Sequence, residues 1–307
     1  MTRARRRDRR PTIRDLPFRH NTKPTLGFEI LSLADIYDRA SRGLIDHSLE
    51  TPQRPAFHMI YLGTRGKGHI VVDFTPTPVG AGFLTFVAQG RVHHFLPEPG
   101  VDAVLMVFSP EFLDLEPRAV DPLRAPAVLS PAWERPALAV GKDPEMTRLV
   151  AMLEAEHARP GDSLQAPILQ ALLRAVLLRA ERLARASDRP PPPTELARFF
   201  TIVERDHLTT RSVAHYAKHA GLSTRTLGEL LVQHTGRSTK QVIDGRVVLE
   251  LKRLLAHTDL SVKELADRAG FAEPTNLVKF FKLHTNTTPQ AFRLSLQDTF
   301  SPSGRRS

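Results

Sequence analysis

The sequence predicts an α+β protein with an N-terminal antiparallel β-barrel or sandwich, a helical connector and a C-terminal all-α domain. Residues 55–108 hold β-branched and aromatic runs separated by glycine- and proline-rich turns, which is typical of short antiparallel strands. Residues 143–187 carry apolar side chains at steps of three and four, which is helical spacing. Beyond residue 194 a helical pattern occurs twice, and no convincing strand is found.

The composition limits the classes of protein to consider. A chain of 307 residues with 41% hydrophobic residues is long and apolar enough for two domains with buried cores. Cysteine is absent, which excludes disulfides and thiolate chemistry. No run of 18 apolar residues occurs, and no apolar segment follows the basic start as it would in a signal peptide. We therefore expect a cytoplasmic protein.

The net charge of +10 is concentrated at the two ends of the chain. Residues 1–10 hold six arginines and one aspartate, and residues 194–307 hold 17 basic and 11 acidic residues. The middle, 11–193, holds 20 basic and 21 acidic residues. This asymmetry indicates a polyanionic partner for the C-terminal part. The basic start has nothing to bury, so we interpret it as a disordered tail rather than a DNA-binding arm.

Four consecutive prolines, 190–193, mark a domain boundary because proline lacks the N–H group and fixes φ. Before them, Leu169, Leu173, Val176, Ala180 and Leu183 form one apolar stripe, which either packs on the barrel or pairs with a second copy of the chain. The expected division is a disordered basic start (1–20), a β domain (21–140), a helical connector (141–187), a proline-rich linker (188–194), an all-α domain (195–298) and a flexible tail (299–307).

The C-terminal duplication is visible when "YAKHAGLSTR" is set above "LADRAGFAEP". At an offset of 49 residues, Ala217, Ala220 and Gly221 fall on Ala266, Ala269 and Gly270. Inward-facing alanines let two helices approach closely, and the glycine takes the left-handed conformation that closes a short turn. Each copy is therefore predicted to be a helix-turn-helix. The first helices begin at Val213 and Val262, the second helices span about 223–234 and 273–284, and Ser261 with Glu264 forms a capping box.

The segment between the two copies, residues 238–258, has one apolar face and predicts a linker helix. From 239 to 257 it would span about 28 Å at 1.5 Å per residue. One turn of DNA is about 34 Å, so the two recognition helices could enter successive segments of the major groove. The alternative is a duplicated helical bundle that binds no nucleic acid.

Residues 194–293 resemble the DNA-binding domain of the AraC/XylS family of bacterial transcription regulators. The stretches that carry the resemblance are "AGLSTRTL", "GRVVLELKRLLAHTDLSVKELADRAGF" and "KFFKLHTNTTPQAFR". The resemblance implies a DNA-binding regulator, usually an activator, with promoter DNA and RNA polymerase as partners. Two positions depart from the family pattern. Asn286 replaces the usual glycine, which asparagine can do because it also adopts left-handed φ, and Thr285 replaces an aromatic residue.

Side chains at the start and on the outer face of a recognition helix reach base edges. Arg225 can bind guanine through two hydrogen bonds, and Asn276 can bind adenine in the same way. The alternative for each residue is a solvated helix face. The predicted DNA contacts are Thr224, Arg225, Gly228, Glu229, Pro274, Thr275, Asn276 and Lys279, with Arg237, Lys240, Lys279 and Lys282 as phosphate contacts.

Residues 55–108 resemble the cupin-like effector-binding domain that precedes many such DNA-binding domains. "GFLTFVAQGRVHHF" fits the second cupin motif at Gly82, Gly90 and His93, with Ala88 in place of proline. The His-x-His pair and glutamate of the first motif are missing. His58, His69 and His93 could still converge on a metal, but we expect hydrogen-bonded or ligand-contacting histidines and no metal or cofactor.

A small-molecule effector is expected inside the barrel, with an aromatic or carboxylated metabolite favoured over a polyol. Which side chains point inward depends on the strand register. The competing hypothesis is a cupin-type metal-dependent enzyme with a nucleic-acid-binding appendage, but no nucleophile–base pair or paired carboxylates offers catalytic residues. The expected effector contacts are Phe57, His58, Tyr61, His69, Phe86, His93 and Met106.

Overall fold

The computed structural model describes residues 14–18, 26–45, 48–96, 98–113, 136–186 and 194–299. Most of the basic start, the proline-rich linker and the C-terminal tail lie outside the described residues, so the expectations for them stay predictions. Among the described helices, none is long and apolar enough to cross a membrane.

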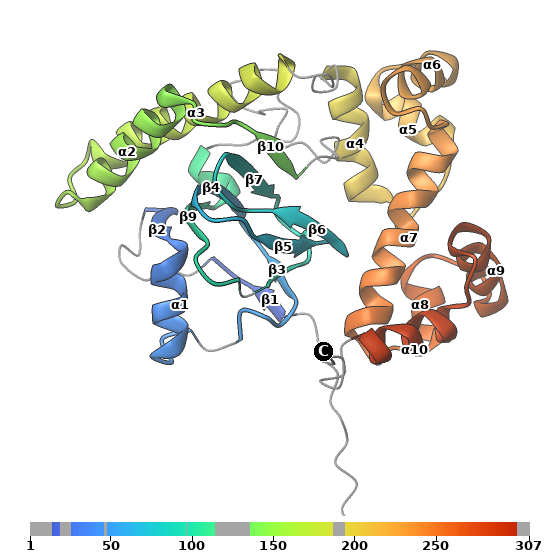
Figure 1. The fold of residues 1–307 in the computed structure, drawn as a ribbon. Coiled ribbons are helices and arrows are strands. Elements are labelled where there is room, and N and C mark those ends of the chain that lie inside the picture. The colour runs from blue at the N-terminus through green and yellow to red at the C-terminus, as the bar shows by residue number, and fades with distance from the viewer. Residues whose placement is uncertain are drawn as a thin grey trace, which may run out of the picture.

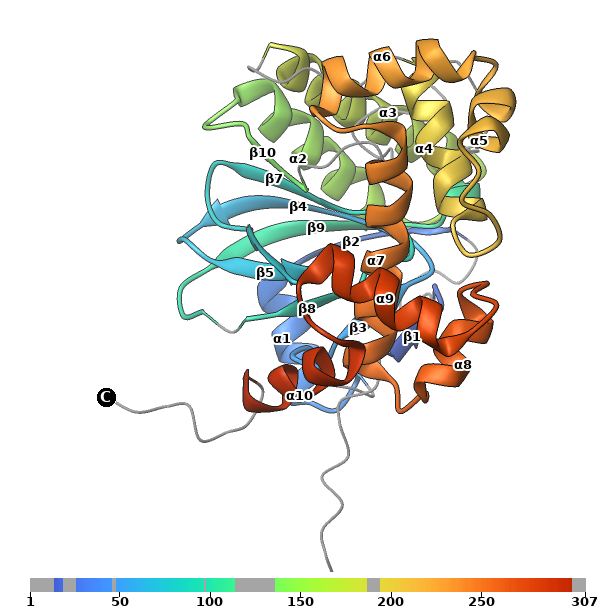
Figure 2. The same ribbon diagram turned by 90° about the vertical axis from the view of Figure 1, so that its right-hand side faces the viewer.

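Two five-stranded sheets form the N-terminal domain (Figures 1 and 2). The described strand pairs are antiparallel except β1 with β3, and the sheets face each other as an open sandwich. One sheet has the order β1 (Arg14–Leu16), β3 (Gln53–Pro55), β8 (His93–Phe95), β5 (His69–Val72), β6 (Thr75–Pro78). The other sheet has the order β10 (Ala137–Ala139), β7 (Phe83–Val87), β4 (His58–Arg65), β9 (Asp102–Phe108), β2 (Phe28–Ser32). The short helix α1 (Leu33–Ser41) follows β2 in the chain, and the short helix η1 (Pro110–Leu113) follows β9.

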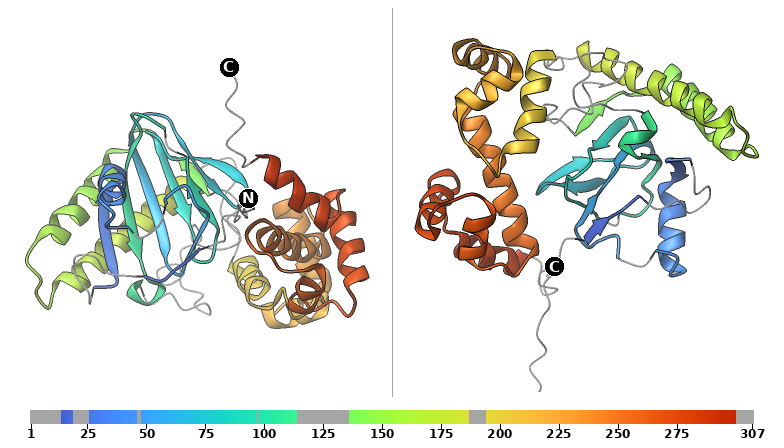
Figure 3. Two further views of the ribbon diagram at one scale, coloured as in Figure 1. Left: turned by 90° about the horizontal axis from the view of Figure 1, so that it is seen from below. Right: turned by 180° about the vertical axis from the view of Figure 1, so that it is seen from behind.

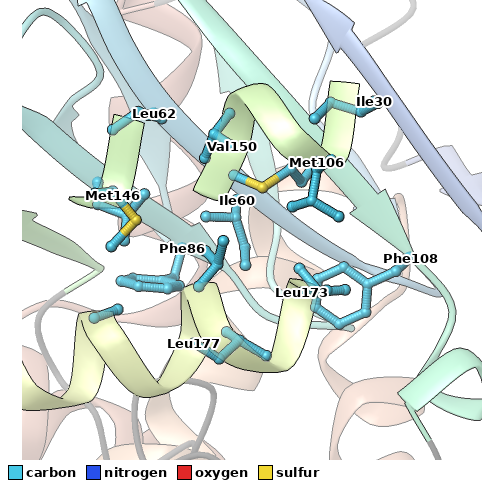
Figure 4. Close-up of a cluster of buried hydrophobic side chains, with 14 of the residues drawn as sticks. Ile30, Ile60, Leu62, Phe86, Met106, Phe108, Met146, Val150, Leu173 and Leu177 are labelled. Atoms are coloured by element: carbon cyan, nitrogen blue, oxygen red, sulfur yellow. The ribbon is translucent and has the colours of Figure 1, made fainter. Parts of the chain in front are cut away.

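The central strand β4 is buried on both faces of its sheet. Met59 and Tyr61 point into the core between the two sheets, while Ile60 and Leu62 point to the opposite face. Helices α2 (Pro144–Ala158) and α3 (Gln165–Arg185) cover that opposite face (Figure 4). The apolar stripe of α3 is therefore occupied: its residues Leu169, Leu173, Val176 and Ala180 are fully buried in this cluster, and Leu183 packs against it. Packing on the sheet, rather than pairing of this stripe with a second copy, is what the structure shows.

The C-terminal domain is all-helical and contains two helix-turn-helix units joined by one long helix. The linker helix α7 supplies Val242 and Ile243 to the core of the first unit, and Leu251 and Leu255 to the core of the second. The two units therefore share a rigid element. The helices are α4 (Thr194–Asp206), α5 (Val213–Ala220), α6 (Thr224–Thr235), α7 (Thr239–His257), α8 (Val262–Arg268), α9 (Pro274–Thr285) and α10 (Pro289–Thr299).

The turns of both units have the predicted geometry. Gly221 and Gly270 adopt left-handed φ values of 76° and 66°, and the Ser261–Glu264 capping box starts α8. Asn286 ends α9 with a φ of 59°, which confirms that asparagine serves at this position. At Gly270 the need for glycine is also steric, because an added Cβ would lie 2.7 Å from the carbonyl oxygen of Leu208.

Gly270→Ala should therefore destabilise the C-terminal domain. Left-handed φ alone costs a residue with a Cβ about 1–2 kcal/mol, and the collision with the Leu208 carbonyl adds to this. The matched control is Gly245→Ala inside α7, where nothing lies within 4 Å of the added Cβ and helix propensity predicts a gain of up to about 1 kcal/mol. Urea unfolding of the full chain, followed by far-ultraviolet circular dichroism, measures both. Equal midpoints for the two variants would contradict the prediction.

Candidate nucleic-acid interface

The two predicted recognition helices, α6 and α9, lie at the edge of the molecule away from the two sheets (Figures 1 and 3). Ser223 caps α6 with its side-chain oxygen, which accepts from the backbone N–H of Thr226. Helix α9 begins with Pro274 at its first position, where the missing N–H costs no hydrogen bond. The turns and caps thus present the first residues of both helices to solvent.

The outer face of α6 forms a shallow hollow with little net charge. Across it, Arg225 Nε donates to Glu229 Oε1 at 2.9 Å, with side chains that are 88% and 64% exposed. At this exposure such a pair is worth only about 0.3–0.5 kcal/mol, so it orders Arg225 weakly and leaves it free to exchange partners. The hollow is lined by Thr224, Arg225, Gly228, Glu229, Val232 and Gln233.

The outer face of α9 has a different chemistry. Thr275, Asn276, Lys279 and Lys282 are all exposed on it, and the next residue, Leu283, is 76% exposed. Leu227 and Leu231 are the buried apolar residues that anchor α6 in its core, and their counterparts in α9, 50 residues later in the chain, are Leu277 and Phe281. Glu229 and Val232 of α6 therefore correspond to the two lysines of α9. The outer face of α6 is therefore close to neutral, and the outer face of α9 is cationic.

The two remaining predicted contacts lie near the start of the linker helix. Arg237 is half-buried in the turn after α6, and Lys240 Nζ lies 2.7 Å from Asp244 Oδ1 on the next turn of α7. Lys240 is 54% exposed, so its ammonium group remains accessible to a phosphate.

Arg211 joins the two units directly. Its Nη2 donates to the carbonyl oxygen of Ala269 at 2.7 Å, and its guanidinium lies 3.9 Å from the centroid of the Phe271 ring. Arg211 precedes α5 of the first unit, whereas Ala269 and Phe271 form the turn of the second. The angle between the units is thus fixed by this contact as well as by α7.

A β-hairpin of the N-terminal domain contacts the linker helix on the side of α7 that faces the sheets (Figures 1 and 2). Its turn residues, Asp73 and Phe74, both have positive φ, 48° and 70°, as in type I′ hairpin turns. The Asp73 carboxylate accepts from Arg253 Nε at 2.8 Å and from Arg253 Nη2 at 2.6 Å. The Phe74 ring faces the His257 ring and meets the edge of Phe292. These contacts hold a bulky residue in a backbone conformation that it would otherwise avoid.

Glu250 extends this contact into a buried cluster of charges. Its carboxylate lies 3.1 Å from Arg253, 3.2 Å from Arg246 and 3.4 Å from Arg54 of strand β3. Arg246 also donates to Glu204 of α4 at 2.8 Å. Burial alone would raise the pKa of Glu250, but the three guanidinium groups outweigh it and lower the pKa to about 2. The carboxylate is therefore ionised at neutral pH.

Three of the expected effector contacts point into the space between the sheets. Phe57 and Tyr61 belong to this core, and His93 is fully buried with its ring 5.9 Å from that of Phe95. Phe95 also meets the edges of Tyr61 and Tyr37. An aromatic cluster with one imidazole thus occupies the interior of the sandwich.

The other four expected effector contacts lie elsewhere, because the strand register places them on opposite faces. Phe86 and Met106 point to α2 and α3 (Figure 4), and His58 stacks on Phe108 on that same side. Burial lowers the pKa of His58 to about 4. His69 is exposed and lies 3.3 Å from Glu98. His58, His69 and His93 therefore do not converge, and the described residues hold no group of three or more metal-ligating side chains.

Sequence reasoning missed the charged contact between the domains. Arg253 and Asp73 are 180 residues apart, and no periodicity links them. Glu250 and Arg253 look like an ordinary solvated pair on a helix, although Arg253 is only 4% exposed. The turn itself gave no local signal, because "DF" is not among the pairs typical of two-residue hairpin turns, such as Asn-Gly or Asp-Gly.

Comparison with protein families places a match in the C-terminal region. A family model described as a helix-turn-helix domain matches residues 216–295. The HTH-type transcriptional activator RhaS of Salmonella arizonae is 28% identical over 155 residues, which cover 48% of this chain and 53% of RhaS. The chain thus spans about half the length of the curated relatives it matches.

Solved structures with similarity to this chain include the global transcriptional factor AdpA and the protein ToxT. The DNA-binding domain of AdpA, solved in complex with a target DNA, is 31% identical, with 33% of this chain and 90% of that chain covered and a TM-score of 0.30. ToxT from Vibrio cholerae is 11% identical, with 87% of this chain and 97% of that chain covered and a TM-score of 0.43.

Asp73→Asn should loosen the contact between the hairpin and α7, because buried Arg253 would lose one of its two carboxylate partners and keep only Glu250 of its own helix. Leaving a buried charge with no partner costs about 3–5 kcal/mol, so the loss of one of two partners should cost less than this. Hydrogen–deuterium exchange read by mass spectrometry should show faster exchange in peptides that cover 69–78 and 246–257. Asp38→Asn is the control, since its pair with Arg42 is exposed on both sides. Unchanged exchange at both peptides would show that the ion pair does not hold the contact.

Glu250 should make the free energy of unfolding of the chain depend on pH in the acidic range. Its folded-state pKa of about 2 lies below its ordinary value of 4.5, so its stabilisation is present above about pH 4.5 and is lost as the pH falls towards about 2. The urea midpoint of the wild type should fall more steeply between about pH 5 and about pH 3 than that of Glu250→Gln, which has no proton to gain. The same pH dependence of the urea midpoint in the wild type and in Glu250→Gln would contradict the assignment of a stabilising, ionised Glu250.

Proposed function

We propose that this chain, whose residues 216–295 match a helix-turn-helix domain model, is a regulator of the AraC/XylS family: a sequence-specific DNA-binding transcriptional activator controlled by a small molecule. The observation that supports it best is the pair of exposed recognition helices joined by one helix of 19 residues. Rigid coupling allows both helices to enter the major groove on one side of a duplex. Cations on α9 and near the start of α7 would neutralise phosphates.

The effector is proposed to bind inside the N-terminal sandwich, which we interpret as a cupin-like domain. Tyr61 and His93 would supply the hydroxyl and imidazole groups that orient a ligand among aromatic side chains. The hairpin offers a route from this site to the DNA-binding domain. Val72 of β5 lies in the core between the sheets, and the next residue, Asp73, is bonded to Arg253 of α7. A ligand that displaces β5 would therefore move the group that holds the linker helix.

Two further partners follow from this proposal. An activator acts by contacting RNA polymerase at a promoter, so RNA polymerase is the expected protein partner. A second copy of the chain would double the number of DNA segments that are bound and raise the avidity. Because the stripe of α3 is occupied by the sheet, such pairing would have to use the outward faces of α2 and α3, where Met152 and Ile168 are 54% and 40% exposed.

The test is a binding titration of the full chain on duplexes selected from a random pool, at several salt concentrations. The logarithm of the affinity should fall linearly with the logarithm of the salt concentration as counterions are released. Arg225→Ala should lose about 1–3 kcal/mol and relax the preference at one base position. Lys279→Ala should weaken all sequences similarly and reduce the salt slope by about one unit.

Lys142→Ala is the matched control, since it removes one exposed cation from the N-terminal domain and should leave both properties unchanged. A folded chain that selects no duplex would refute the proposed function. Unchanged base preference in Arg225→Ala would refute only the assignment of the first recognition helix.

A further inference from the structure

Gly228 is a glycine that the packing of the protein does not require. It lies inside α6 and does not have positive φ. The nearest atom to an added Cβ would be Thr239 Oγ1 at 3.9 Å, an ordinary contact distance. A glycine inside a helix nevertheless costs about 1 kcal/mol relative to alanine. A glycine with no internal role on an exposed face leaves room for the close approach of a ligand.

The surroundings of Gly228 define what could approach it. Val232 follows one turn later and is 55% exposed, which makes the floor of the hollow apolar. Beside it, the charges of Arg225 and Glu229 neutralise each other at 2.9 Å. A phosphate would meet a glutamate and a valine here, whereas the same positions of α9 offer Lys279 and Lys282. The hollow therefore suits an uncharged, apolar group.

Building on the proposed function, we propose that the hollow formed by Gly228 and Val232 receives the 5-methyl group of a thymine in the major groove. Among the groups that base pairs present there, the thymine methyl is the apolar one, and the others are hydrogen-bond donors and acceptors. A valine placed against those polar groups would remove their water without replacing its hydrogen bonds. The thymine methyl fits both the space left by the missing Cβ and the chemistry of the valine.

The neighbouring Arg225 extends this recognition to the adjacent base pair. Its Nε is bonded to Glu229, so its two terminal nitrogens remain available for guanine O6 and N7. The first recognition helix would then read a guanine beside a thymine with no net charge on its face. The second helix would supply more of the phosphate binding.

The test replaces each thymine of a selected duplex in turn by deoxyuridine, which pairs identically with adenine and lacks only the methyl group. At one position in the segment bound by α6, the full-length wild type should lose affinity by about fourfold, the equivalent of one buried methyl group. Val232→Ser should abolish this difference between thymine and uracil. Gly228→Ala should weaken binding to the thymine duplex and restore it on the uracil duplex, because the alanine methyl then fills the space.

Gly245→Ala is the control, because it also replaces a helical glycine but lies in α7, and it should keep the wild-type preference for thymine. Equal affinity of the wild type for thymine and uracil at every position would overturn the inference. So would a thymine preference that persists unchanged in both Val232→Ser and Gly228→Ala. Either result leaves the proposed function standing, whereas failure to select any duplex refutes that function itself.

Discussion

The arrangement of this molecule depends on one helix that must satisfy three packing partners at once. Helix α7 places Ile243 in the core of the first unit and Leu251 in the core of the second, while Arg253 turns towards the N-terminal hairpin. These directions are fixed relative to one another by the helical repeat. A rotation or shift of α7 would therefore disturb both helix-turn-helix cores and the contact with the sheets together.

The contact between the domains combines the rings around Phe74 with a cluster of buried charges, and the charges have physical consequences. Asp73 and Glu250 have only 10% and 8% of their side chains exposed, and each lies against guanidinium groups. Burying such charges costs several kcal/mol of hydration per ion, which their mutual attraction must offset. When the domains separate, water replaces the partners across the contact, Arg253 for Asp73 and Arg54 for Glu250, so opening is less unfavourable than exposing an apolar core of the same size. A polar interface of this kind suits domains that must move relative to each other.

The two recognition helices have the same fold but not the same surface. Leucine or phenylalanine anchors occupy equivalent positions in both, and both end in a left-handed residue, Gly236 or Asn286. Their outward positions have diverged, with a neutral hollow on α6 and two lysines on α9. Apolar packing preserves the scaffold, because a change there would leave a cavity or a collision. The exposed positions are free to differ because they contact no protein core.

The sequence by itself determined the local structure of the C-terminal domain, including the left-handed turns at Gly221 and Gly270, the capping box at Ser261 and the bounds of α7. These features depend on short-range rules of periodicity, capping and backbone conformation, which the sequence states directly. It also predicted short antiparallel strands within residues 55–108. Which face of β4 holds His58 and which holds Tyr61 was decided only by the tertiary structure, because a shift of one residue in register exchanges the two faces of a strand. The contact between Asp73 and Arg253 was also decided only by the tertiary structure. The two side chains are 180 residues apart, and their contact depends on how the two folded domains pack together, which no local sequence pattern encodes.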